Sequence, residues 1–155
     1  MTSIKTYCDE IVKEFDSIPA ARKILLEKIS SYIQQKKQEH KPIQLVYVCT
    51  HNSRRSHFGQ IWAQVAAHFY NIKNVRTFSG GTEATAFNIN AINASKRVGF
   101  RIERTTDSAN PLYYLYFDET EKPIQCFSKV YHDDVNPKHE FAAIMTCSDA
   151  EENCP

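Results

Sequence analysis

Neither sign of charge dominates this sequence, and it contains no long apolar run. Its 19 Lys and Arg residues nearly cancel its 18 Asp and Glu residues, which leaves a formal charge of +1. No overall field draws such a protein onto nucleic acid or an anionic membrane, so we expect neither as a partner. No stretch approaches the roughly 18 apolar residues that span a bilayer, and the N-terminus lacks the pattern of a signal peptide. These absences predict a cytoplasmic protein.

Internal repeats, low-complexity tracts and the motif G-x4-G-K-[ST] are also missing from the sequence. The last of these absences excludes a nucleotide-binding P-loop. What remains is a chain of 155 residues, 42% hydrophobic and 24% charged, which is the usual range for one globular unit. Five cysteines without an export signal indicate reactive or buried thiols rather than a disulfide framework.

Residues 1–42 are predicted to form an N-terminal helical extension of two helices. Apolar residues recur at helical spacing from Ile4 to Phe15. Ser17 and Pro19 are typical of an N-cap and a first turn, and they predict the start of the second helix. The apolar side of that helix consists of Leu25, Ile29, Tyr32 and Ile33.

Residues 43–155 alternate between strand and helix patterns, which predicts an α/β domain with a doubly wound parallel sheet. The predicted strands cover residues 45–48, 75–79 and 141–145, and helices follow the first two at 58–69 and 88–98. Residues 113–117 and 124–127 predict an edge hairpin. Because ligands of such sheets bind at the carboxyl ends of the strands, the residues at these ends are the candidates for function.

The first predicted strand runs into the motif C-x5-R-S, which spans Cys49 to Ser56 and precedes an amphipathic helix. A loop that wraps toward a helix N-terminus presents backbone N–H groups and the positive end of the helix dipole, and this combination fits a tetrahedral oxyanion. The planar fork of Arg55 can hold two oxygens of that anion. The predicted oxyanion-binding loop consists of Thr50, His51, Asn52, Ser53, Arg54 and Arg55.

Cys49 is the predicted nucleophile of this loop. The loop N–H groups, the helix dipole, Arg55 and the Ser56 hydroxyl all favour its thiolate form. A cysteine after four apolar residues could instead be a small buried residue that ends a strand. The Arg-Ser pair at a fixed offset, placed between strand and helix, favours the catalytic interpretation of Cys49, Arg55 and Ser56. We expect Arg54 to point outward.

A second pair of cysteines, Cys147 and Cys154, follows the last predicted strand. The alternatives are a thiol–disulfide relay, two unrelated cysteines and a zinc site with a histidine. Their C-x6-C spacing differs from that of zinc knuckles, so we expect no metal. Ser148 and Asp149 predict the N-terminus of a helix between the two cysteines. Cys8 and Cys126 lie in apolar-patterned segments and are predicted to be packing residues.

Three segments carry a resemblance to known families: residues 48–56, residues 78–88 and residues 146–155. They resemble the low-molecular-weight protein tyrosine phosphatases and, more closely, the thioredoxin-coupled arsenate reductases of the same fold. The resemblance implies that Cys49 is the nucleophile, that Asn52 braces the loop, and that Cys147 and Cys154 relay oxidation to thioredoxin, with no cofactor. It also implies three loop-supporting residues: Ser79, Asn88 and Asp107.

The sequence departs from the family pattern in its loop and at its general acid. His51 stands where the loop commonly has glycine, Arg54 where reductases often carry cysteine, and Gln60 where a carboxylate often helps to hold a potassium ion. The family's general acid is an aspartate in an Asp-Pro loop, and this chain has no Asp-Pro. We therefore expect a C-terminally incomplete domain that lacks its last strand and helix, and the alternative is a naturally short protein. The weak substitutes within the chain are Asp107, Asp133, Asp134 and Asp149.

The favoured function is arsenate reduction through a relay of Cys49, Cys147 and Cys154, with arsenate as substrate and thioredoxin as electron donor. The first alternative is hydrolysis of phosphotyrosine-type phosphate esters through a Cys49 phosphoenzyme. The second is a non-enzymatic module that binds oxyanions or senses redox state. A phosphatase has no need for the second pair of cysteines, and this favours the reductase.

Overall fold

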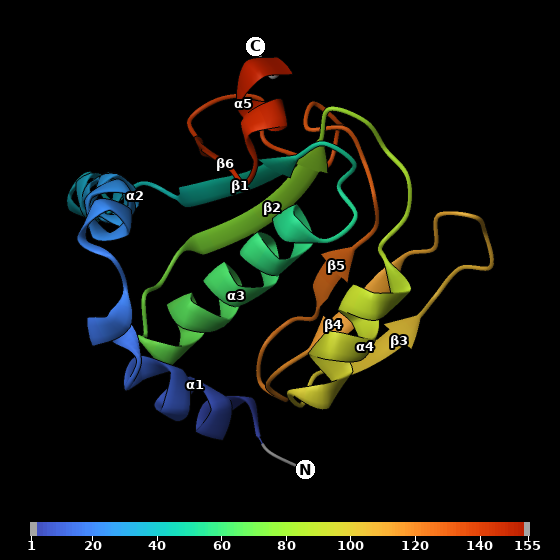
Figure 1. Cartoon of the computed structure of the whole chain (residues 1–155), viewed down its shortest axis with the longest axis horizontal. Helices are drawn as coiled ribbons and strands as arrows, with labels where there is room; N and C mark the ends of the chain where they lie inside the picture. The colour runs from blue at the N-terminus through green and yellow to red at the C-terminus, as the bar shows by residue number, and fades with distance from the viewer. Residues whose placement is uncertain (1–2, 154–155) are drawn as a thin grey trace.

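The computed structural model describes residues 3–153 as two small sheets packed around helices (Figure 1). In chain order the elements are α1 (Ile4–Val12), a 3-10 turn (Phe15–Ser17), α2 (Ala20–Gln38), β1 (Ile43–Cys49), α3 (Arg55–Phe69), β2 (Val75–Gly81), α4 (Ile89–Arg97), β3 (Arg101–Arg104), β4 (Tyr113–Tyr116), β5 (Ile124–Cys126), β6 (Ala142–Met145) and α5 (Ser148–Asn153). No helix within this described range is long and apolar enough to cross a membrane.

The first sheet is parallel, with strand order β2-β1-β6, which confirms the predicted α/β class. Cys49 pairs in register with Gly81 of β2, and Val48 pairs with Met145 of β6, so the three strands end at one edge. Helix α3 packs closely on one face of this sheet (Figure 1). Gly59 permits that approach, because a Cβ there would lie 2.2 Å from the Tyr47 ring. The parallel pairing thus brings the ends of β1 and β6 together.

The second sheet is antiparallel, with strand order β3-β4-β5. Strand β4 pairs with β5, and this pairing confirms the predicted hairpin. Strand β3 was not predicted, because its sequence contains one apolar residue, Ile102, between charged residues. The main core lies between α3, α4 and this sheet, and it includes Ile61, Val65, Ile92 and Leu115.

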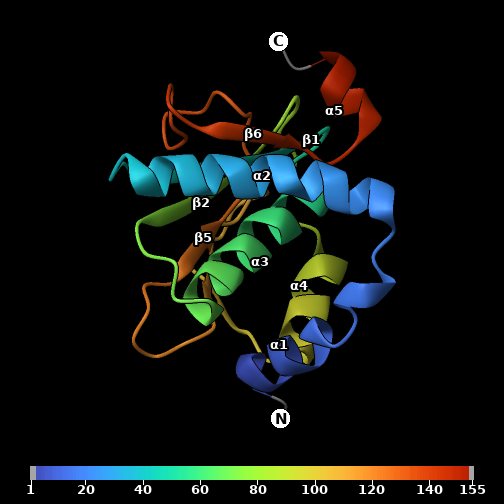
Figure 2. The same ribbon diagram turned by 90° about the vertical axis from the view of Figure 1, so that its left-hand side faces the viewer.

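The N-terminal helices differ in how they join this core. Ile4 and Cys8 of α1 are buried in the main core, so α1 packs as an integral part of it. Helix α2 has no buried residue and lies across the molecule in front of α3 in Figure 2. Leu25, predicted on its apolar side, is 52% exposed. The hydroxyl of Tyr32 attaches α2 to the carbonyls of Gln44 and Glu140, at 3.3 and 3.1 Å.

The prediction that Ser17 caps α2 is wrong. Ser17 ends the preceding 3-10 turn, where its hydroxyl donates to the Glu14 carbonyl at 2.6 Å. Pro19 occupies the N-cap position and Ala20 begins the helix. Ser17 precedes Ala20 by too many residues to reach the first N–H groups of α2, and its hydroxyl is taken by the closer carbonyl.

Candidate active site around Cys49

Cys49 is the last residue of β1 and is 2% exposed. Its Sγ lies 3.0 Å from the Oγ of buried Ser56, in the first turn of α3. The Asn52 side-chain amide donates to the same Ser56 Oγ at 2.8 Å. Because that hydroxyl oxygen accepts a hydrogen bond from Asn52, its own O–H is free to donate to the Cys49 sulfur. The structure thus gives the Cys49 sulfur one oriented hydrogen-bond partner, the Ser56 hydroxyl.

Four carbonyl groups of the loop, those of residues 49, 50, 51 and 53, point away from its interior and accept hydrogen bonds from other segments. Their donors lie at 2.8–3.2 Å and are the N–H groups of Thr82, Glu83 and Asn88 and the hydroxyls of Thr82, Thr85 and Ser128. None of the N–H groups of residues 51–54 donates to a backbone carbonyl within residues 3–153. Carbonyls fixed outward and N–H groups left unpaired make the arrangement that binds an anion at a helix N-terminus.

Asn52 holds the loop in this conformation. Its φ of 41° lies in the left-handed region, which asparagine tolerates better than most residues. Its side chain is fully buried and accepts from the Lys129 N–H at 2.9 Å while donating to Ser56. Gly81 lies against the backbone of Asn52, so closely that a Cβ at Gly81 would be only 2.7 Å from the Asn52 nitrogen. The bracing of the loop therefore depends on both Asn52 and a glycine in β2.

The two arginines of the loop are both exposed. Arg54 occupies the N-cap position of α3 without capping it, and Arg55 begins the helix. The side chain of Arg55 makes no hydrogen bond or ion pair with another described residue. Its guanidinium thus has donors left for a ligand at the mouth of the loop. The exposed His51 side chain faces Glu83, with Nε2 3.6 Å from Oε2.

Cys147 lies beside this loop, just after β6. Its Sγ is 3.6 Å from the Thr50 hydroxyl, which also donates to the Asp149 carboxylate at 2.6 Å. Partial burial opposes ionisation of the Cys147 thiol, but hydrogen bonds from the Ala150 N–H and from Thr50, together with the Arg55 charge, lower its pKa overall. The structure therefore places a second thiol, with a lowered pKa, next to the Cys49 loop. Cys154, the third cysteine of the predicted relay, lies outside the described residues.

Buried polar residues support the loop from below. The Ser79 hydroxyl lies 3.3 Å from His57 Nδ1, and His57 stacks on Phe87 with ring centroids 4.3 Å apart. Burial, helped by the Lys129 charge, lowers the pKa of His57 to about 3. Ser79 thus acts on α3 through His57, whereas Asn88 acts on the loop directly through its N–H, which donates to the Ser53 carbonyl.

Asp107 does not support the loop as we expected. Its fully exposed carboxylate pairs with Arg104 at 2.9 Å, just after β3. Asp107 lies beside the second sheet because it follows the end of β3 by only three residues. Of the four aspartates considered as general acids, Asp149 contacts the loop, while Asp134 pairs with Lys138 on the surface.

Several residues that hold the loop could not be found from the sequence. Ser128 and Thr85 both donate to the His51 carbonyl, and Ser128 also accepts from the Thr85 N–H at 2.7 Å. Isolated hydroxyl residues in irregular segments have no spacing that identifies them. Only the Ser-Gly-Gly run that ends β2 indicates a close approach in this part of the sequence.

Within residues 3–153, no group of three or more His, Cys, Asp and Glu side chains is arranged to hold a metal ion. Comparisons with protein families and with curated proteins found no match to this chain.

Proposed function

We propose that the protein is an arsenate reductase with a fold of the low-molecular-weight phosphatase type, and that Cys49 is its nucleophile. The observation that carries this proposal is the position of Cys147, whose sulfur lies 3.6 Å from the hydroxyl of Thr50, the residue that follows Cys49. A hydrolase that uses one thiolate and water needs no second thiol at this place. A reductase needs one, because reduction of arsenic takes two electrons from two thiols.

In the first step, the Cys49 thiolate attacks the arsenic of arsenate and one oxygen leaves as water after protonation. Unpaired N–H groups of residues 51–54 and the Arg55 guanidinium hold the remaining oxygens, and the Ser56 hydroxyl steadies the thiolate before attack. Asp149 is the candidate proton donor, because among the four aspartates named as substitutes for the general acid it is the one whose carboxylate contacts the loop.

In the second step, the Cys147 thiolate attacks the Cys49 sulfur of the arsenic adduct. A Cys49–Cys147 disulfide forms, the sulfur–arsenic bond breaks with its electron pair passing to arsenic, and arsenite leaves. The two thiols are oxidised by two electrons while arsenic(V) is reduced to arsenic(III). The lowered pKa of Cys147 supports this role, because the attacking group is the thiolate.

In the third step, Cys154 attacks the Cys147 sulfur and restores the Cys49 thiolate, which leaves a Cys147–Cys154 disulfide for thioredoxin. Helix α5 spans Ser148–Asn153, between these two cysteines. Cysteines seven positions apart on a helix are separated by about 10.5 Å along its axis, beyond the roughly 7 Å between Cα atoms that a disulfide allows. We therefore expect α5 to unwind on oxidation, which limited proteolysis of the reduced and oxidised protein can detect. Equal protection of α5 in both states would contradict this step.

Steady-state assays separate reduction from hydrolysis. With thioredoxin, thioredoxin reductase and NADPH, arsenate should cause continuous NADPH oxidation, and the rate should fall to background when thioredoxin is left out. Steady hydrolysis of an aryl phosphate without any thiol donor, together with no thioredoxin-dependent arsenate reduction, would instead establish the phosphatase. Tight phosphate binding without either activity would indicate an oxyanion-binding module.

A further inference from the structure

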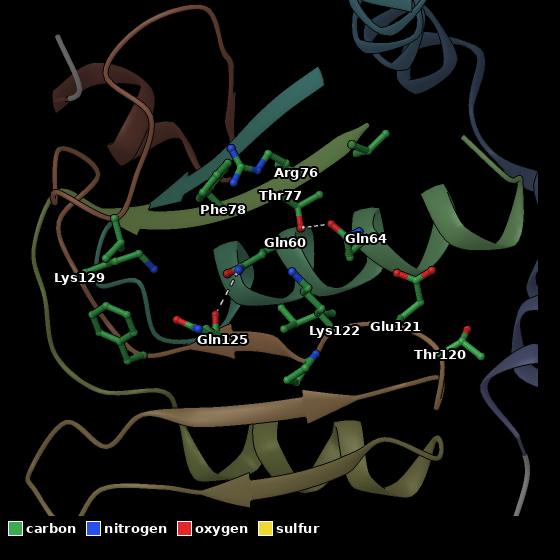
Figure 3. Close-up of a pocket in the computed structure, with 15 residues that line it drawn as sticks. Gln60, Gln64, Arg76, Thr77, Phe78, Thr120, Glu121, Lys122, Gln125 and Lys129 are labelled. Carbon is green, nitrogen blue, oxygen red and sulfur yellow. Dashed lines mark hydrogen bonds between the residues drawn. The ribbon is translucent and has the colours of Figure 1, made fainter. Parts of the chain in front are cut away.

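A cavity of about 590 Å³ lies between the two sheets, away from the Cys49 loop. In Figure 3, β2 forms one wall, the segment through β5 forms the opposite wall, and α3 lies between them. Strands β2 and β5 are both edge strands and do not pair with each other, although Gly81 at the end of β2 forms a single bridge to Val130 after β5. None of residues 49–56 lines this cavity. It is therefore a separate candidate site.

Lys129 is the most unusual residue of this cavity. It is only 4% exposed, yet its ammonium forms no hydrogen bond or ion pair with any residue of the described chain. The ammonium lies over the face of the Phe127 ring, whose centroid is 4.6 Å from Nζ. Figure 3 shows the side chain extending into the cavity. A buried cation without a counter-ion is unfavourable, so an anion bound in the cavity would stabilise it.

Gln60 supplies a second unsatisfied group from α3. It is 5% exposed, and its Nε2 donates to the Gln125 carbonyl at 3.2 Å. Its Oε1 is buried and accepts no hydrogen bond from the described residues. Figure 3 shows this amide at the cavity side of α3. A bound molecule that carries a hydroxyl group would satisfy this acceptor.

The charges and rings of the lining define the rest of the ligand. Arg76 and Lys122 are exposed at the rim and add two positive charges to that of Lys129, against one acidic lining residue, Glu121. This excess of positive charge disfavours a cation and favours an anion. The rings of Phe78 and Phe127 also line the cavity, and they suit a flat apolar body.

We propose that this cavity binds a small aromatic carboxylate that carries a hydroxyl group. Lys129 pairs with the carboxylate, and the Gln60 Oε1 accepts from the hydroxyl. Arg76 and Lys122 attract the anion to the rim. Because solvent screens their charges, each contributes less to the binding free energy than Lys129 does.

The protonation of Lys129 gives this site a pH dependence. Burial lowers the pKa of Lys129 to about 8, against smaller opposite effects of Cys126 and Asp133. The other charged or titratable groups that face it are Arg76 of β2, Glu121 and Lys122 before β5, and His57 of α3. Because the carboxylate pairs with the ammonium and not with the neutral amine, its affinity should decrease as the pH rises above about 8.

The test is an NMR titration of the protein with para-hydroxybenzoate, with para-hydroxybenzamide as the matched uncharged probe. Backbone signals of Gln60, Phe127 and Lys129 should shift saturably with the carboxylate, which should bind about tenfold more tightly than the amide. Lys129→Met should remove that preference. The backbone N–H that Lys129 donates to Asn52 remains in this variant, so the Cys49 loop keeps its support.

Two further arms keep the result unambiguous. Saturating inorganic phosphate should leave binding of para-hydroxybenzoate unchanged, and displacement by phosphate would place the ligand in the Cys49 loop and overturn the proposal. Should Lys129→Met fail to fold, the two probes on the unchanged protein at pH 7 and pH 9 decide. Equal affinity for acid and amide, an affinity independent of pH, or no saturable binding of the acid would each overturn the proposal.

Discussion

Cys49 and Cys126 each end a β-strand and each are buried, but their surroundings are opposite in character. Cys49 lies 3.0 Å from a hydroxyl that a buried amide orients, at an edge where backbone N–H groups are unpaired. Cys126 lies in the apolar core, where burial raises the pKa of its thiol to about 12. The comparison teaches that two equally buried cysteines can differ in the partners that the fold gives them. Cys49 has a polar partner at its sulfur, whereas Cys126 has apolar neighbours.

The largest expected effect comes from substituting Cys49, with a substitution of Cys126 as the control. Cys49→Ser should lower both arsenate reduction and aryl phosphate hydrolysis by about 1000-fold or more, because both begin with the same thiolate. Cys126→Ala is the matched control and should change turnover by less than about threefold, while lowering the free energy of unfolding by about 1–2 kcal/mol. Turnover assays and urea unfolding measure both. Loss of activity in Cys126→Ala at normal stability would contradict the assignment.

Cys147 extends the comparison to a thiol whose pKa is lowered rather than raised. Cys147→Ser should reduce thioredoxin-coupled arsenate reduction by about 100-fold or more, because water cannot supply the electrons that release arsenite. Hydrolysis of an aryl phosphate should change by less than about threefold. A variant that keeps full thioredoxin-coupled turnover would remove the main argument for a reductase.

Ser56→Ala tests the hydroxyl that separates the Cys49 environment from that of Cys126. Without this donor the Cys49 thiolate loses its 3.0 Å partner, and we expect kcat to fall by about tenfold to 100-fold. The rate of Cys49 alkylation near neutral pH should fall in parallel. Ser148→Ala, which removes an exposed hydroxyl at the start of α5, is the control and should leave both rates unchanged.

The smallest expected effect concerns stability and comes from His57 beneath the loop. Its pKa is about 3 in the folded protein and about 6.5 when unfolded, so the unfolded state binds the additional proton between these values. The free energy of unfolding should therefore rise with pH between about 3 and 6.5, by up to about 1.4 kcal/mol per pH unit from this residue. His57→Gln should flatten that dependence, whereas His139→Gln, at an exposed site, should not. Identical slopes in unfolding experiments on the two variants would refute the role of His57.

The sequence predicts the elements with strong periodicity well. The strands β1, β2 and β6 and the helices α3 and α4 were predicted close to their observed bounds, because each alternates or repeats apolar residues over several positions. Strand β3 was missed, since charged residues flank its single apolar residue and pairing with β4 decides its conformation.

The residues of the candidate site also fall into two groups: those predicted from a local motif and those brought to the loop by tertiary contacts. Cys49, Ser56 and Arg55 follow from one motif between a strand and a helix. Ser128 and Lys129 could not be predicted, because they reach the loop across 77 residues of sequence through hydrogen bonds that leave no spacing pattern. Asp107 was predicted by resemblance to support the loop, but it follows β3 of the other sheet and pairs there with Arg104.

The most direct test of the account is a single turnover of the Cys154→Ser variant with arsenate and no thioredoxin. Peptide mapping by mass spectrometry should find one disulfide, between Cys49 and Cys147, and one arsenite released per protein molecule, after which the reaction stops. Cys8 and Cys126 should remain free thiols, as their buried positions imply. Arsenite release without a Cys49–Cys147 disulfide, or no arsenite at all while both thiols stay reduced, would contradict the proposal that these two cysteines supply the electrons.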